Sequence, residues 1–221
     1  MNLPMFNQQI DIDKIKSLVG EDIKISLHLS ETFDPFVLDS IMRKAHLETF
    51  KRALHIAEAL DAFLINMHLS KGIHFTLPDK KLQLYNKYKD KYMIYVEDFC
   101  KLIEDISIPL CIENTGIHNI AYIQEASDRL LATPGVYLTY DIGHDITSDY
   151  KDKAYYDSRE DKIRHYHIHD GTPEKNHLEL FTGQLDIELF LNQASSKGAT
   201  CVIEVKSSDQ LIRSVKKLED I

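Results

Sequence analysis

Short apolar runs alternate along this chain with longer stretches of helical periodicity. We predict strands near residues 23–28, 63–68, 108–113, 136–141, 164–169 and 200–204. These runs are rich in Ile, Leu, Val and Tyr and show little polar alternation, so we expect strands that are buried on both faces, as in a parallel sheet. The repeated strand–helix order predicts an α/β fold.

Helical patterns fill the intervals between these strands. The first helix is predicted to begin after Asp34 and Pro35, a capping residue followed by proline, and to end near Leu60 with Ile41 on its apolar face. Further helices are expected at about 81–105, 117–132, 187–197 and 208–218. No linker or low-complexity segment divides the chain, so we expect a single domain over residues 1–221.

Nearly every predicted strand ends on a side chain that can bind a metal ion. These residues are His28, His68, Glu113, Asp141, Glu204 and, in the strand near residues 164–169, the three alternatives His165, His167 and His169. Closure of a barrel would bring all of the strand ends around one point, whereas the outer ends of an open α/β sheet would lie too far apart. We therefore predict a TIM-type (β/α) barrel that is shortened at its N-terminus, with an open sheet as the alternative. Residues 2–6 could supply one more strand.

Carboxylates and imidazoles together suit a divalent cation with mixed oxygen and nitrogen ligands. Glu113 and Glu204 are the hardest to explain otherwise, because an ionised carboxylate after an apolar strand costs on the order of several kcal/mol unless it is paired or metal-bound. Their alternative interpretation is an ion pair with a lysine. His28 and His68, taken alone, fit a metal ligand and an ordinary polar residue equally well.

Composition narrows the classes of partner. The chain has 26 basic and 35 acidic residues and a net charge of −9, which disfavours a broad surface for DNA or RNA. Inward carboxylates that a cation would offset weaken this argument without reversing it. The apolar fraction of 43% is sufficient for a core. We find no signal peptide or membrane-spanning pattern, and the three cysteines lack metal-finger spacing, so we expect a cytoplasmic protein without a membrane partner.

Several strand ends resemble motifs of the xylose isomerase-like TIM-barrel superfamily, which includes sugar isomerases, sugar epimerases and endonuclease IV. CIENTG resembles the glutamate motif of endonuclease IV, DIGH its aspartate-x-x-histidine motif and HIHD its histidine-x-x-aspartate motif. IEVK matches the last glutamate of the family, and the resemblance spans residues 24–206. It selects His167 over its neighbours His165 and His169 as the ligand.

The resemblance implies a metal centre. Its ligands would be Glu113, Asp141, His167 and Glu204. Further histidines fall where endonuclease IV keeps the ligands of its additional zinc ions, namely His28, His68, His144 and His177. The aspartate expected two residues before the last histidine is Lys175 here, and a lysine beside a cation is unfavourable unless it is neutral or turned away. We therefore expect one or two ions of Mn, Zn, Co or Mg rather than three.

The first hypothesis for the function is metal-dependent isomerisation or epimerisation of a sugar or sugar phosphate. The metal would stabilise an enediolate while Glu113 and Glu204 act as catalytic base and acid. The expected substrate contacts are His68, Lys71, His144 and His169.

Two alternatives remain. One is an endonuclease IV-like phosphodiesterase that acts at abasic sites in DNA, which the extra histidines favour and the acidic balance and Lys175 oppose. The other is a metal- or sugar-binding module without turnover. With either function, a homodimer would cover the apolar edges that a shortened barrel leaves.

Overall fold

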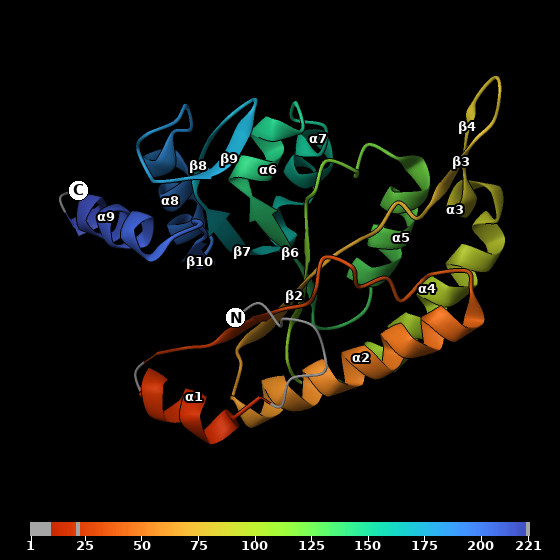
Figure 1. Ribbon diagram of the computed structural model, residues 1–221, viewed down its shortest axis with the longest axis horizontal. Coiled ribbons are helices and arrows are strands. Elements are labelled where there is room, and N and C mark those ends of the chain that lie inside the picture. The colour runs from red at the N-terminus through yellow and green to blue at the C-terminus, as the bar shows by residue number, and fades with distance from the viewer. Residues whose placement is uncertain (1–9, 21–22, 220–221) are drawn as a thin grey trace. The chain divides into compact units, whose positions relative to one another are not determined.

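The computed structural model of the chain describes residues 10–20 and 23–219 (Figure 1). Its main sheet has the strand order β1-β2-β5-β6-β7-β10. The bounds are Ser26–His28 for β1, Leu64–His68 for β2, Leu110–Glu113 for β5, Val136–Asp141 for β6, Ile163–Ile168 for β7 and Thr200–Ile203 for β10. Sequence order and spatial order agree, as the (β/α) prediction requires. The additional strand predicted at residues 2–6 lies outside the described residues.

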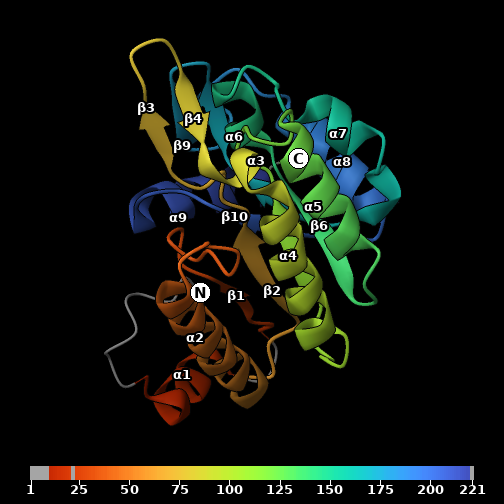
Figure 2. The same cartoon turned by 90° about the vertical axis from the view of Figure 1, so that its right-hand side faces the viewer.

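Helices and two hairpins complete the described structure. The helices are α1 (Ile12–Val19), α2 (Ser40–Ala59), α3 (Leu84–Lys87), α4 (Lys89–Ile103), α5 (Ala121–Leu131), α6 (Ile142–Thr147), α7 (Lys153–Asp157), η1 (Glu160–Lys162), α8 (Ile187–Ser196) and α9 (Ser208–Glu219). The hairpins are β3 (His74–Thr76) with β4 (Lys81–Gln83) and β8 (Asp170–Thr172) with β9 (Lys175–Leu178). The β3–β4 hairpin extends as a narrow ribbon beside α3 (Figure 2). No helix among the described residues is long and apolar enough to cross a membrane.

The chain forms two compact units. Unit 1 comprises residues 1–112 and 125–136, and unit 2 comprises residues 113–124 and 137–221. Unit 1 therefore contains β1, β2 and most of β5, while unit 2 contains Glu113, most of β6, and the whole of β7 and β10. The single domain expected from the sequence stays a prediction.

Helix α2 of unit 1 begins later than the sequence predicts, at Ser40 rather than directly after Pro35. Asp39 is its N-cap, and its Oδ1 atom accepts hydrogen bonds from two backbone N–H groups of the first turn, both at 2.9 Å. Asp34 closes a local turn before the helix instead, because its Oδ1 accepts the backbone N–H of Phe36 at 3.2 Å and its Oδ2 accepts the hydroxyl of Tyr85. The predicted capping residue therefore lies five residues before the true cap.

The buried face of α2 agrees with the sequence pattern only in part. Ala57, which the pattern places on the apolar face together with Ile41, is buried beside Phe50 and Ala53, whereas Ile41 is 81% exposed. The ring of Phe50 lies 5.1 Å from that of Phe99 on α4, which fixes this face of the helix against unit 1.

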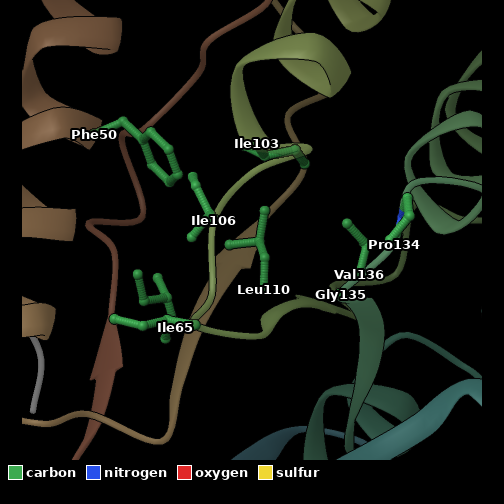
Figure 3. A pocket seen from close by; sticks show the side chains of 9 residues that line it. Phe50, Ile65, Ile103, Ile106, Leu110, Pro134, Gly135 and Val136 are labelled. Carbon is green, nitrogen blue, oxygen red and sulfur yellow. The ribbon is translucent and has the colours of Figure 1, made fainter.

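A small cavity lies in the apolar core of unit 1 (Figure 3). Its volume of about 10 Å³ is close to the room that one water molecule requires. Phe50, Ile65, Ile103 and Leu110 are among its lining residues, and none of the lining side chains is polar. It is therefore a gap in the packing rather than a binding site.

In unit 2 the register of the parallel strands β6, β7 and β10 determines which side chains lie together. Asp141 on β6 pairs with His167 on β7, and Val202 on β10 is the next partner of His167. Neighbouring residues of a strand point to opposite faces, so Tyr140 and Tyr166, which also pair in register, face away from Asp141 and His167.

Candidate metal centre

Four side chains of unit 2 converge, each at or beside the carboxyl end of a strand. One ligand atom from each of Glu113, Asp141, His167 and Glu204 lies within 4.8 Å of the corresponding atoms of the other three. Glu113 and Asp141 end β5 and β6, His167 is the penultimate residue of β7, and Glu204 follows β10. The structure thus brings together the four residues that the family resemblance implies. Three are buried, and the Glu204 side chain is 37% exposed.

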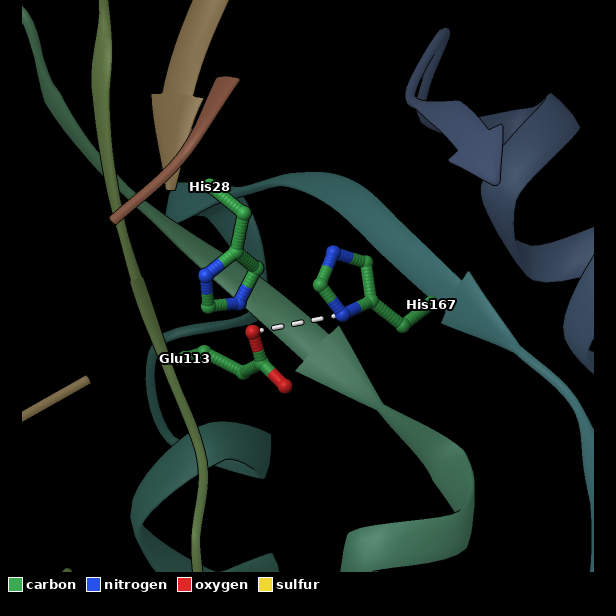
Figure 4. A group of neighbouring side chains, drawn as sticks. All are labelled: His28, Glu113 and His167. Carbon is green, nitrogen blue, oxygen red and sulfur yellow. Dashed lines mark ion pairs between the residues drawn. The ribbon is translucent and has the colours of Figure 1, made fainter. Parts of the chain in front are cut away.

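A single imidazole nitrogen faces three carboxylates in this cluster. His167 Nδ1 lies 3.2 Å from Glu113 Oε2, 3.1 Å from Glu204 Oε2 and 3.7 Å from Asp141 Oδ2. Figure 4 shows the ion pair between Glu113 and His167. One nitrogen carries at most one proton, so it cannot compensate three carboxylates. The donor set of three carboxylates and one imidazole fits a divalent cation with mixed ligands.

The electrostatics of His167 reflect the same arrangement. Burial alone would lower the pKa of His167, but the charge of Glu113 and hydrogen bonds to Asp141, Glu113 and Glu204 raise that pKa well above its usual value. A concentration of negative charge that raises a histidine pKa also attracts a metal cation.

Asp141 is held rigidly from both its backbone and its side chain. Its backbone N–H donates to Asn114 Oδ1 at 2.7 Å, and Asn114 Nδ2 donates to its carbonyl oxygen at 2.8 Å. Its carboxylate caps α6 by accepting the backbone N–H of His144 at 2.6 Å. His169 Nε2 lies 3.0 Å from Asp141 Oδ1. The charge of His144 and hydrogen bonds to histidines outweigh burial, so the pKa of Asp141 is lowered.

Two residues of this arrangement were not predicted from the sequence. Asn114 directly follows the candidate ligand Glu113 in the sequence ENTG. Asparagine is common in turns, so its presence there does not indicate a hydrogen-bonded bridge to the next strand. Gly143 of DIGH allows His169 to approach, because a Cβ atom at Gly143 would lie 1.9 Å from His169 Cε1. A glycine at this position indicates that another group packs closely against the backbone, but the sequence does not show that this group is His169.

Hydrogen bonds to Asp152 hold the loop that follows Glu113. The Asp152 carboxylate accepts the backbone N–H groups of Gly116 and His118, each at 2.6 Å, and its Oδ2 lies 3.4 Å from the His118 ring nitrogen. His118 is fully buried. It therefore serves the structure of the loop that carries Asn114.

Further histidines of unit 2 lie beside the four candidate ligands. His144 Nδ1 lies 3.2 Å from Glu113 Oε1, and interactions with Asp141 and Glu113 outweigh burial and raise the pKa of His144 to about 9. His177 Nδ1 lies 3.1 Å from the carbonyl oxygen of Glu204. Ligand atoms of His169, His177 and Glu204 form a second group within 4.8 Å.

Lys175, which replaces an aspartate of the family pattern, lies on β9 and is exposed. A solvated lysine can turn away from a cation, so its presence does not prevent metal binding at the four ligands.

The remaining predicted residues belong to unit 1. His28 ends β1, His68 ends β2, and their rings lie 4.9 Å apart in an edge-to-face arrangement. Lys71 is exposed in the segment after β2. Their roles as additional ligands or substrate contacts stay predictions.

The chain belongs to the xylose isomerase-like TIM-barrel family, because the model of that family matches residues 4–220. This membership confirms the predicted superfamily and the (β/α) barrel class. No curated protein sequence matches the chain.

Solved structures support the same assignment of the fold. The 3-keto-D-glucoside 4-epimerase YcjR of E. coli has a TM-score of 0.67 at 15% identity, over 95% of this chain and 84% of that chain. D-psicose 3-epimerase of Clostridium cellulolyticum H10, solved with D-tagatose, has a TM-score of 0.64 at 13% identity, over 95% and 81%. The IOLI protein, solved with a zinc atom, has a TM-score of 0.65 at 14% identity, over 94% and 79%. At these identities the likeness shows a common fold.

Proposed function

We propose that the protein is a divalent-metal-dependent isomerase or epimerase of a sugar or sugar phosphate. The observation that carries this proposal is the convergence of Glu113, Asp141, His167 and Glu204 within 4.8 Å at the strand ends of unit 2. The names of two solved neighbours, a 3-keto-D-glucoside 4-epimerase and a D-psicose 3-epimerase, support the substrate class. We propose one or two ions of Mn, Zn, Co or Mg, and the zinc atom of the IOLI structure supports a metal of this kind.

The four converging residues would hold the cation. When bound, a divalent cation supplies Lewis acidity, which polarises a substrate carbonyl and makes the neighbouring C–H group more acidic. Glu113 and Glu204 each have two carboxylate oxygens, so one oxygen can face the cation while the other takes or returns a proton. The partly exposed Glu204 side chain can contact a substrate that enters from solvent, whereas the buried Glu113 side chain would contact the substrate from the interior of the site.

The histidines divide into two proposed roles. His144, with a side chain that is 20% exposed, is proposed to orient a substrate hydroxyl. His169 is fully buried against Asp141, so we propose that it positions this ligand rather than contacting substrate as the sequence suggests. His68 and Lys71 remain proposed contacts to a distal hydroxyl or phosphate.

Proton exchange tests this function directly. The Mn²⁺-loaded protein, incubated with D-psicose, D-tagatose or D-ribulose in deuterated water, should introduce deuterium at the carbon next to the carbonyl. EDTA, Glu113→Gln and Glu204→Gln should each reduce the exchange at least about 100-fold, since each removes the acidifying cation or a proton carrier.

Glu179→Gln is the matched control, because Glu179 forms ion pairs with Arg213 and Lys217 rather than with a member of the cluster. Absence of exchange with a panel of ketoses and their phosphates, in protein that retains bound metal, would overturn the isomerase proposal.

The second candidate function is hydrolysis of a phosphodiester at abasic sites in DNA. The additional group of His169, His177 and Glu204 favours it, because this group could bind a further ion beside the first. Incision of an abasic duplex by zinc-loaded protein, abolished by EDTA and by His177→Ala, together with about three bound zinc ions, would support this candidate. Incision that is equal in His177→Ala would argue against it.

A further inference from the structure

A groove of about 400 Å³ lies on unit 2, away from the metal centre. Tyr140 and Tyr166 line it from β6 and β7, and each is the strand neighbour of a proposed metal ligand, so both point to the opposite face of the sheet. Tyr156 of α7 and Phe190 of α8 complete its aromatic walls. We call this cavity the tyrosine groove.

A buried carboxylate lines the tyrosine groove, and only one of its two oxygens accepts a hydrogen bond. Asp145 is 1% exposed, and its Oδ2 accepts a hydrogen bond from the Tyr140 hydroxyl at 2.5 Å. Its other oxygen, Oδ1, has no hydrogen-bond partner in the part of the chain that the structure describes. The nearby Tyr150 N–H donates to the backbone carbonyl of Asp145 instead. A buried acceptor without a donor is destabilising, so a ligand that brings a donor would relieve that cost.

The charged groups at the rim do not neutralise Asp145. Lys153 Nζ lies 2.9 Å from Asp157, and Lys197 Nζ lies 3.0 Å from Glu160, so each lysine already has a carboxylate of its own. The lining of the groove therefore carries one negative charge in excess. A ligand with a positively charged group would therefore complement the charge of the groove.

We propose that the tyrosine groove binds a small amine whose apolar or aromatic body packs between the tyrosine rings and whose ammonium group meets the Asp145 carboxylate. Aromatic faces attract cations, and an ammonium group is both the hydrogen-bond donor and the charge that Asp145 lacks. A cavity of this volume is large enough for a molecule of that kind. The site is separate from the proposed sugar site and does not depend on the proposed function.

Phenethylamine is the probe for this site, and NMR titration of the zinc-loaded full chain is the measurement. Its dissociation constant should be on the order of 1 mM or lower, a range suited to a fragment of its size. Backbone signals of residues 140, 145, 156 and 190 should shift. The isosteric neutral 2-phenylethanol and the anion phenylacetate should bind at least about tenfold more weakly.

Two variants test the residues of the site. Asp145→Asn should weaken phenethylamine at least about tenfold, while Glu188→Gln, which changes an exposed carboxylate of α8 outside the groove lining, should change its affinity less than about twofold. Ser196→Trp places a large ring at the groove wall and should abolish binding of phenethylamine while leaving Asp145 in place. It therefore tests the site even if the Asp145→Asn protein does not fold. Equal affinity for the amine and the alcohol, shifts confined to the metal centre, or full binding by Ser196→Trp would each overturn the proposal.

Discussion

Asp141 combines three tasks in one residue. It ends β6, it caps α6, and its carboxylate belongs to the four-residue cluster. A side chain held at both oxygens loses little conformational freedom when a cation binds, which favours a preorganised site. Because Asp141 has all three roles, loss of a residue that holds it should disturb the end of β6, the start of α6 and the cluster together.

Asn114→Ala should weaken both metal binding and stability. The change removes two buried hydrogen bonds to the backbone of Asp141, so we expect a loss of about 1–3 kcal/mol in the free energy of unfolding. Zinc affinity should fall about 10- to 100-fold, because Asp141 is no longer held in place. Urea unfolding and isothermal titration measure the two effects. Asn192→Ala, at an exposed position on α8, is the control, and unchanged zinc affinity in Asn114→Ala would refute the positioning role.

Gly143→Ala should force His169 from its position. The added Cβ would lie 1.9 Å from the His169 ring, and such overpacking costs about 1–3 kcal/mol. The double variant Gly143→Ala/His169→Ala tests this contact as a thermodynamic cycle, in which the glycine substitution should cost much less once the ring is absent. Additive effects of the two changes would show that the clash is not the cause.

At the scale of elements, the loop of residues 114–118 depends on Asp152. Burial raises the pKa of the Asp152 carboxyl, but the hydrogen bond from His118 and those from backbone N–H groups have the larger combined effect and hold it below its usual value. A carboxyl with a lowered pKa in the folded state stabilises the protein above its unfolded-state pKa, and this contribution is lost as the pH falls through the folded-state value.

Asp152→Asn should therefore cost about 1–3 kcal/mol at pH 7, and its stability should approach that of the wild-type protein as the pH falls below about 4. Urea unfolding between pH 7 and pH 3 measures the difference. Asp149→Asn, three residues before the α7 cap, provides a carboxylate control. A difference between the proteins that is constant across this range would contradict the ionised role of Asp152.

The sequence allowed the order of strands and helices to be predicted because buried parallel strands have a strong hydrophobic pattern. Strand β6 was predicted at its exact bounds, and β1, β2, β5, β7 and β10 within a few residues. Helix α6 and the β8–β9 hairpin were missed because they are short and begin directly after strands, so their residues appear to belong to loops. The start of α2 was wrong because the chain offers two capping aspartates, of which Asp34 closes a local turn and Asp39 caps the helix.

The candidate ligands could be predicted because each follows an apolar run, and the order of the motifs matched one superfamily. Their partners could not be predicted in the same way. The bridge from Asn114 to Asp141 and the packing of His169 on Gly143 join residues that are more than 20 positions apart, and no period in the sequence encodes such contacts.

At the scale of the whole molecule, the three carboxylates of the cluster contribute to the net charge of −9, and a cation would offset them. Binding to the folded state alone stabilises a protein by about 2.7 kcal/mol when the free ligand is at 100 times its dissociation constant. Zn²⁺ or Mn²⁺ should therefore raise the melting temperature, and EDTA should reverse the rise.

Calorimetry with and without metal measures this shift, which should be at least halved in Glu204→Gln and unchanged in Glu179→Gln. An equal shift in all three proteins would mean that the metal stabilises the fold from another place.

The alternation of side chains along β6 and β7 places two different surfaces on neighbouring residues, with Asp141 and His167 on one face and Tyr140 and Tyr166 on the other. Insertion or deletion of one residue within either strand would exchange these faces, since the side-chain period of a strand is two. Such a change would send a tyrosine into the cluster of carboxylates and a ligand into the aromatic groove. Loops around this sheet can therefore change in length far more readily than these two strands can.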